Sequence, residues 1–110
     1  PKEYYLGEIK ENYPRSALCQ MGQLHYLLCT ANGDSYYQHT PNIYTFAKYI
    51  HATGCEKAYT LDGGQTAVLI FMGKQLNKIG SYDGGKTNSR PTCEVMGVGY
   101  SEQVGTYEVR

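Results

Sequence analysis

The residues best suited to chemistry stand in one short block, residues 59–66, which reads YTLDGGQT. Asp62 supplies a carboxylate at the end of a strand-like run. Gly63 and Gly64 follow it, and because glycine has no side chain they let backbone N–H groups approach a ligand closely. A polar loop of this kind is also a common turn between two strands. The surroundings of the block therefore have to decide between a turn and a binding site.

The chain around this block reads as strands with one helix. The helix is expected to begin at Pro41, after an N-cap at Thr40, and to end before Gly54. Apolar residues recur inside it at helical spacing: Ile43, Phe46, Ala47 and Ile50. The expected strands are residues 4–9, 15–21, 24–31, 57–61, 66–72, 75–79 and 92–100, of which 66–72 is expected to be buried. This order predicts an α+β fold, a mixed β-sheet with one main helix packed on it, as a single domain or part of a larger one.

The predicted topology brings polar residues to one edge of the sheet. Residues 24–31, the helix and residues 57–61 form a strand–helix–strand unit, so the two strands are expected to be parallel, with a right-handed crossover. Asn32-Gly33-Asp34 follows the first of these strands, and Asp62-Gly63-Gly64 follows the second. Arg15 is expected at the same edge. These groups suit an anionic, oxygen-rich ligand, and the alternative is that Arg15 pairs with one of the two carboxylates as a salt bridge.

Composition and charge disfavour several classes of partner. The chain has 110 residues, of which 41% are hydrophobic, enough for a folded core. Ten basic and ten acidic residues give no net charge, which disfavours a nucleic-acid or anionic-membrane surface. The longest apolar run, residues 67–72, is too short to span a bilayer. The chain has twelve tyrosines, a residue that suits surfaces that are partly apolar and partly solvated. Tyrosines fill strands more often than they stack on sugars.

Neither a metal nor a cofactor is expected. The histidines have no metal-ligand spacing with one another or with cysteine: His25, His39 and His51. Asp83-Gly84-Gly85 repeats the Asp-Gly-Gly tripeptide, but no strand precedes it, so it is interpreted as a turn.

Four cysteines, Cys19, Cys29, Cys55 and Cys93, could make two disulfides or none. A hairpin turn at Gly22-Gln23 would place Cys19 opposite Tyr26 and Cys29 opposite Ser16. The two sulfurs would then lie about 10 Å apart, too far to bridge. We therefore expect mostly buried free thiols.

Several segments together resemble the phosphodiester glycosidase family. Its pattern is P-R-[ST]-A, a strand ending in D-G-R, a helix, N-L-D-G-G-G-S-S, and a late strand that contains R-P. The matching segments here are residues 14–17 (PRSA), 61–64 (LDGG) and 90–91 (RP), and the resemblance covers about residues 15–99. It implies a domain that splits a sugar-1-phosphodiester of the N-acetylglucosamine-1-phosphate type, in an extracellular or cell-surface setting.

The chain departs from the family pattern at three places. Asn32-Gly33-Asp34 replaces D-G-R, and Gln65-Thr66-Ala67 replaces G-S-S. The family's upstream N-G-G-x-F-like motif has no counterpart before Pro14. The chain therefore resembles the C-terminal part of such a domain, and we expect an upstream segment or a partner chain to complete it.

The resemblance implies roles for individual residues. Asp62 would be the catalytic carboxylate, Asp34 a second carboxylate, and Arg15 a cation that holds phosphate. The implied substrate-binding residues are Ser16, Asn32, Gly33, Gly63, Gly64, Gln65, Thr66 and Arg90. One carboxylate can suffice because the departing phosphate monoester is a good leaving group, whereas ordinary glycoside hydrolysis uses two.

Two other hypotheses remain open. The chain could be a non-catalytic carbohydrate-binding or cell-surface module of the same fold, which the replaced D-G-R and G-S-S positions favour. It could also be a structural half-domain that associates with a partner chain, which predicts exposed apolar edges.

Overall fold

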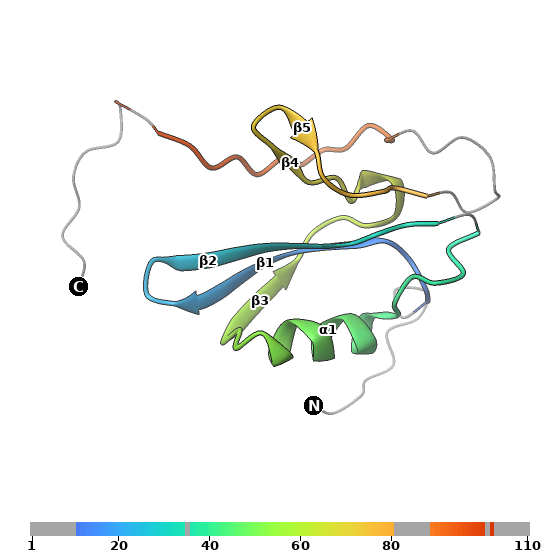
Figure 1. The fold of residues 1–110 in the computed structure, drawn as a ribbon, viewed down its shortest axis with the longest axis horizontal. Coiled ribbons are helices and arrows are strands. Elements are labelled where there is room, and N and C mark those ends of the chain that lie inside the picture. The colour runs from blue at the N-terminus through green and yellow to red at the C-terminus, as the bar shows by residue number, and fades with distance from the viewer. Residues whose placement is uncertain (1–10, 35, 81–88, 101, 103–110) are drawn as a thin grey trace.

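The computed structural model describes residues 11–34, 36–80, 89–100 and 102. A three-stranded sheet consists of β1 (Arg15–Gly22), β2 (His25–Ala31) and β3 (Lys57–Thr60). The helix α1 (Ile43–Ala52) lies along one face of this sheet, and a small hairpin of β4 (Ile70–Phe71) and β5 (Lys74–Gln75) lies beyond the other face (Figure 1). A short 3-10 helix, η2 (Gly64–Thr66), follows β3. The predicted α+β fold with one main helix is confirmed.

The strand order is β2-β1-β3, and β1 runs antiparallel to both of its neighbours. Strands β2 and β3 therefore run in the same direction, as predicted, with β1 between them. The ends of β2 and β3 consequently lie at the edge where β1 begins. This arrangement brings the start of β1 next to the Asp62 loop.

The predicted register of the first hairpin is wrong by one residue. Cys19 pairs with Leu27, and Cys29 pairs with Ala17. Gly22 remains in the ladder opposite His25, and the register shifts between Gln20 and Gly22. The turn, at Gln23-Leu24, falls one residue later than predicted, which alone would shift the pairing by two residues, and an irregularity in β1 that takes up an extra residue reduces this shift to one. This slip matters because a shift of one residue exchanges the two faces of a strand.

The helix begins later than predicted. Its N-cap is Asn42, whose side-chain oxygen accepts a hydrogen bond from the Thr45 N–H at 2.8 Å. Thr40 instead donates its hydroxyl to the Tyr37 carbonyl at 2.7 Å. Gly54 follows the helix with a φ of 92°, the left-handed conformation that a glycine in this place favours.

The core lies between the helix and the sheet. Its buried members are Ala17, Cys19, Phe46, Ile50 and Cys55. Four partly buried residues pack against them: Met21, Leu27, Cys29 and Ala31. Ala47, predicted on the buried face of the helix, is exposed, so the helix buries only a narrow apolar stripe.

The long strand predicted for residues 66–72 is wrong. Only two of its residues are in a strand, and Phe71 and Met72 are 65% and 88% exposed. The Asn77 side chain takes the place of a neighbouring strand: its oxygen accepts from the Leu69 N–H at 2.7 Å, and its NH₂ group donates to the Ala67 carbonyl at 2.6 Å.

The other late strands are also shorter than predicted. Of residues 75–79 only Gln75 is in a strand. Residues 92–100 form no strand, and they are exposed to solvent. The strand predicted at residues 4–9 and the turn at 83–85 lie outside the described residues.

Candidate functional site

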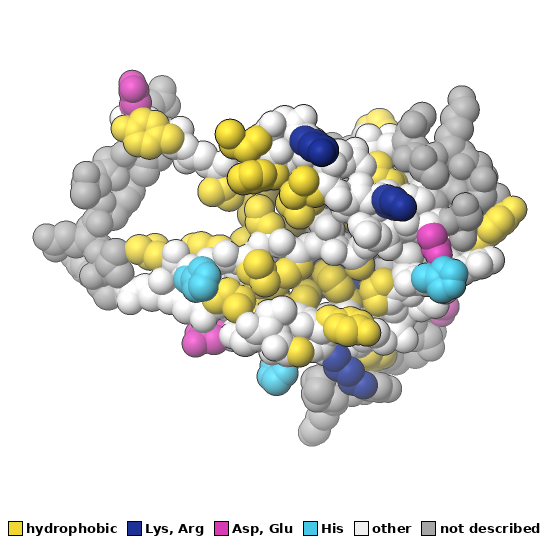
Figure 2. Space-filling view, viewed as in Figure 1, with side chains coloured by type: hydrophobic (Ala, Val, Ile, Leu, Met, Phe, Trp, Pro, Cys, Tyr) yellow, Lys and Arg dark blue, Asp and Glu magenta, His cyan; other side chains and the backbone are white. Residues whose placement is uncertain are grey.

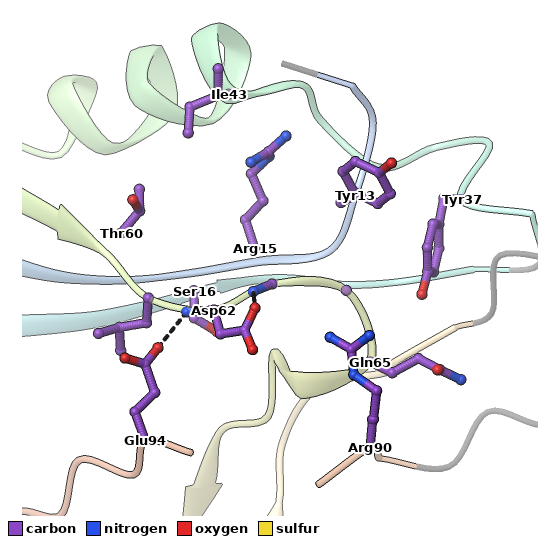
Figure 3. A pocket seen from close by; sticks show the side chains of 13 residues that line it. Tyr13, Arg15, Ser16, Tyr37, Ile43, Thr60, Asp62, Gln65, Arg90 and Glu94 are labelled. Atoms are coloured by element: carbon purple, nitrogen blue, oxygen red, sulfur yellow. Dashed lines mark hydrogen bonds between the residues drawn. The ribbon is translucent and has the colours of Figure 1, made fainter. Parts of the chain in front are cut away.

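A cavity of about 750 Å³ opens where β1 begins and β3 ends (Figure 3). The start of β1 and the loop after β3 contribute most of its wall. The loop before the helix, the helix itself and the segment around residues 90–94 contribute the rest. The lining residues are Tyr13, Arg15, Ser16, Tyr37, Ile43, Thr60, Leu61, Asp62, Gly63, Gly64, Gln65, Arg90 and Glu94.

Backbone hydrogen bonds hold the Asp62 loop against the start of β1. The Leu61 N–H donates to the Ser16 carbonyl at 2.9 Å, and the Gly64 N–H donates to the Pro14 carbonyl at 2.8 Å. A Cβ at Gly63 would lie 2.8 Å from the Pro14 oxygen, closer than such contacts allow. Gly64 has a φ of 64°, which also favours glycine. Gly63 is therefore required by the close approach of the two segments, and Gly64 is favoured by its backbone conformation.

The Asp62 carboxylate is exposed to the cavity. Its Oδ1 accepts a hydrogen bond from the Gly63 N–H at 2.9 Å, which fixes the orientation of the side chain. Its other oxygen, Oδ2, has no hydrogen-bond partner among the described residues. Asp62 thus combines a fixed orientation with an oxygen that can reach a ligand.

Arg90 and Glu94 come to the cavity from a segment near the C-terminal end. The Arg90 N–H donates to the Gln65 carbonyl at 3.2 Å, and the Glu94 Oε1 accepts from the Asp62 N–H at 2.5 Å. These two bonds fasten the segment to the Asp62 loop. Arg90 was predicted as a site residue, whereas Glu94 was not. No pattern in the sequence around residue 94 distinguishes Glu94 as a site residue.

Arg15 lines the cavity but is engaged in the structure itself. Its Nε donates to the Pro41 carbonyl at 3.3 Å, and its Nη2 donates to the Glu11 carbonyl at 2.5 Å. The guanidinium points toward the helix side of the sheet, while Asp62 lies on the other side (Figure 3). Burial lowers the pKa of Arg15 below its ordinary value. Arg15 therefore ties the start of β1 to the segment that precedes the helix.

Asp34 lies outside the cavity, together with its two predicted neighbours. The Asp34 Oδ2 accepts from the backbone N–H of His39 at 3.0 Å and lies 2.5 Å from its ring Nδ1. The Asn32 side-chain oxygen accepts from the Lys78 N–H at 3.1 Å, and Gly33 packs against the Ile79 backbone. Asn32 lines a second cavity, of about 620 Å³. The structure therefore does not bring the two predicted carboxylates to one site.

Ser16 carries a buried hydroxyl beside the Asp62 loop. The residue is 8% exposed and lines the cavity, but its Oγ has no hydrogen-bond partner among the described residues. A buried hydroxyl without a partner is costly, so a ligand or a water is expected to bind it. Thr66, in contrast, does not line the cavity and donates its hydroxyl to the Gly63 carbonyl at 2.6 Å.

Two aromatic rings at the cavity were missed by the sequence analysis. Tyr13 and Tyr37 meet edge to face, with ring centroids 5.9 Å apart and planes at 72°. Tyrosine faces of this kind suit the apolar side of a sugar ring. The abundance of tyrosine was the available signal, but it did not indicate which of the twelve would be used.

A metal centre is not evident in the part of the chain that the structure describes, where no three His, Cys, Asp or Glu side chains are placed to hold an ion. No helix within the described ranges is long and apolar enough to cross a membrane.

The comparison with protein families gives one match. The family model described as phosphodiester glycosidase matches residues 3–98, which is most of the chain. No curated protein and no solved structure matches. The match includes the Asp62 loop, the start of β1 and the Arg90–Glu94 segment that together form the cavity. The chain belongs to the phosphodiester glycosidase family.

Proposed function

We propose that the cavity at Asp62 binds a sugar joined through its anomeric carbon to a phosphodiester, and that it hydrolyses the bond between that carbon and oxygen. The sugar is proposed to be of the N-acetylglucosamine-1-phosphate type, carried on a glycan. The observation that carries the proposal is that a carboxylate, Asp62, and a cation, Arg90, line one cavity in a member of this family.

The reaction needs few protein groups. Water or the Asp62 carboxylate attacks the anomeric carbon, the carbon–oxygen bond breaks, and its electron pair leaves with the phosphate monoester. When water attacks directly, Asp62 accepts its proton as a general base. When Asp62 attacks, water later hydrolyses the glycosyl ester. Arg90 compensates the negative charge of the departing phosphate in either course.

Other lining residues are proposed to orient the substrate. The unpartnered Ser16 hydroxyl and the Gln65 side chain offer hydrogen bonds to sugar or phosphate oxygens. Tyr13 and Tyr37 offer an apolar surface to the sugar ring. Arg15 contributes by holding β1, and Asp34 is assigned no part in the reaction.

A second candidate function is glycan binding without turnover. The observation that favours it is the placement of the predicted catalytic residues. Asp34 lies outside the cavity, and Arg15 donates to backbone carbonyls. Of the three, Asp62 lines the cavity with a carboxylate oxygen that has no hydrogen-bond partner among the described residues. A binding module would retain its affinity for the sugar phosphate and show no release of sugar.

The first test is the release of N-acetylglucosamine from its methyl phosphodiester. The chain is assayed alone and joined to its native upstream sequence, because the family resemblance suggests that a further segment completes the domain. Asp62→Asn is expected to abolish release while the fold is kept. Asp34→Asn is the matched control, and we expect it to retain activity because Asp34 is outside the cavity.

The outcomes separate the candidates. Equal activity of wild type and Asp62→Asn would remove Asp62 from the mechanism. Binding without release, unaffected by Asp62→Asn, would favour the binding module. An extracellular or cell-surface location is also proposed, and fractionation of cells that produce the full protein would test it.

A further inference from the structure

Three of the four cysteines gather between the helix and the sheet, away from the cavity at Asp62. Cys19 and Cys55 are buried, and Cys29 packs against the same core cluster. The Sγ atoms of Cys19 and Cys29 lie 3.6 Å apart. All three are free thiols in the structure.

The observed register explains why two of these sulfurs meet. Cys29 is paired with Ala17, and Cys19 is paired with Leu27, so the two cysteines are diagonal neighbours on adjacent strands. They point to the same face of the sheet, the one that the helix covers. The sequence-based register had placed them too far apart to bridge. The one-residue difference from that register therefore changes the expected chemistry of this pair.

We propose that Cys19 and Cys29 are a site of disulfide formation, in which a small-molecule or protein disulfide oxidises the pair and cross-links β1 to β2. A disulfide has an S–S distance of about 2.05 Å, so the sulfurs must approach by about 1.5 Å. Diagonal neighbours have Cα atoms about 7–8 Å apart, at the upper limit for a disulfide, so the backbones of the two strands must also move closer as the side chains rotate. The cross-link would tie the strand that carries Ser16 to its neighbour.

Cys29 is the better partner for Cys19 than Cys55 is. The Cys55 thiol donates a hydrogen bond to the Lys57 carbonyl at 3.1 Å, which holds it in place. Cys55 is only 9% exposed, whereas Cys29 is of intermediate exposure. An external disulfide therefore reaches Cys29 more readily. Cys19 is fully buried, so it acts in the second step, from inside the protein.

The chemistry proceeds by two thiol–disulfide exchanges. The Cys29 thiolate attacks the external disulfide, forms a mixed disulfide and releases one thiol. Cys19 loses its proton to solvent and attacks the Cys29 sulfur, and the second external thiol leaves. In total two protein thiols lose two electrons and two protons, and one external disulfide becomes two thiols. Oxidised glutathione is a sufficient oxidant for the test.

The experiment incubates the full chain, in a Cys93→Ser background, with oxidised glutathione. Cys93 is exposed and is removed so that it cannot form links between molecules. The expected product is a chain lighter by about 2 Da, the two hydrogens lost in the exchange. Tryptic cleavage leaves Cys19 and Cys29 in one peptide, residues 16–48. Cleavage after Met21 then splits this peptide into halves that stay joined until a reductant is added.

Two variants complete the test. Cys29→Ser is expected to prevent the mass loss, and Cys55→Ser is expected to leave the cross-link unchanged. The oxidised chain is also expected to unfold at a higher temperature than the reduced chain. Persistent free thiols after oxidation, or a link from Cys19 to the peptide of residues 49–57 that contains Cys55, would overturn the proposal. Neither result depends on the proposed glycosidase activity.

Discussion

At the scale of single residues, the orientation of Asp62 depends on its contacts with neighbouring atoms. The Gly63 N–H fixes its carboxylate, and the Glu94 carboxylate fixes its backbone N–H. Glu94 thereby joins a distant segment to the loop, and Arg90 comes with that segment. The position of the cavity's proposed cation thus depends on the bond of Glu94 as well as on the bond from its own backbone N–H to the Gln65 carbonyl.

Substitution of Glu94 tests this dependence. Glu94→Ala is expected to lower sugar release or sugar-phosphate binding at least several-fold, because the bond between residue 94 and the Asp62 loop is then lost. Glu94→Gln should keep most of the function, since its amide oxygen can accept the same bond. Isothermal titration and the release assay measure both. If Glu94→Gln loses as much as Glu94→Ala, the charge of Glu94 is itself required, and a purely positioning role is contradicted.

The site was only partly predictable from the sequence at this scale. The Asp-Gly-Gly block and Arg90 could be found because they form a local pattern with a family resemblance. The structural role of Arg15 could not be predicted, because its partners are the backbone carbonyl groups of Glu11 and Pro41. Every residue has such a group, so the sequence does not indicate which ones Arg15 binds. The position of Asp34 is similarly decided by His39 rather than by the motif around it.

At the scale of elements, Asn77 replaces part of a β-ladder. Its buried side chain bonds the backbone of Ala67 and of Leu69, and it thereby closes the loop that follows η2. Asparagine in a polar stretch gives no sign of such a bridge. This explains why residues 66–72 were predicted as a continuous strand. The helix, in contrast, was found because its apolar spacing and its terminal glycine are local features.

Asn77→Ala is expected to destabilise the chain by about 2 kcal/mol, because it leaves buried backbone groups of two residues without partners. Urea unfolding followed by circular dichroism measures the change. Lys74→Ala, at an exposed position on β5, is the control and should change stability little. If Asn77→Ala changes the free energy of unfolding as little as Lys74→Ala does, water must satisfy the backbone groups that the substitution frees.

The Cys19 thiol is expected to make the stability of the folded chain depend on pH in the alkaline range. Burial raises the pKa of Cys19 to about 12, with smaller contributions from the Cys55 and Cys29 thiols, against an ordinary value of 9.0. Below pH 9.0 the thiol is neutral in both the folded and the unfolded chain, so its contribution to stability is present in full. Above that pH the unfolded chain ionises first, so stability is lost as the pH rises toward 12.

The free energy of unfolding of the reduced chain should therefore fall with pH by up to about 1.4 kcal/mol per unit in this window, in addition to the effects of other groups. Cys19→Ala removes this contribution while lysines and tyrosines titrate as before. The difference between the slopes of the two proteins, measured by urea unfolding with a reductant present, isolates Cys19. Identical slopes would mean that the thiol ionises equally easily in the folded chain.

At the scale of the whole molecule, the described surface carries many large apolar side chains. Figure 2 shows hydrophobic side chains at the surface over β4 and β5. In that hairpin Ile70 is 61% exposed and Phe71 is 65% exposed, and Leu76 beyond it is 57% exposed. The helix covers one face of the three-stranded sheet, whereas Tyr26 on β2 and Tyr59 on β3 remain exposed. The expectation that an upstream segment or a partner chain completes the domain stays a prediction.

The chain alone is consequently expected to associate with itself, because contiguous apolar surface is favourably removed from water. Sedimentation velocity should show species larger than a monomer that increase with concentration. A double variant, Phe71→Lys with Met72→Lys, is expected to reduce this association, since both side chains are exposed on one hairpin. Lys74→Ser, on the neighbouring strand, is the matched control and should associate as the wild type does. A wild-type chain that remains monomeric at every concentration would show that this apolar surface needs no cover.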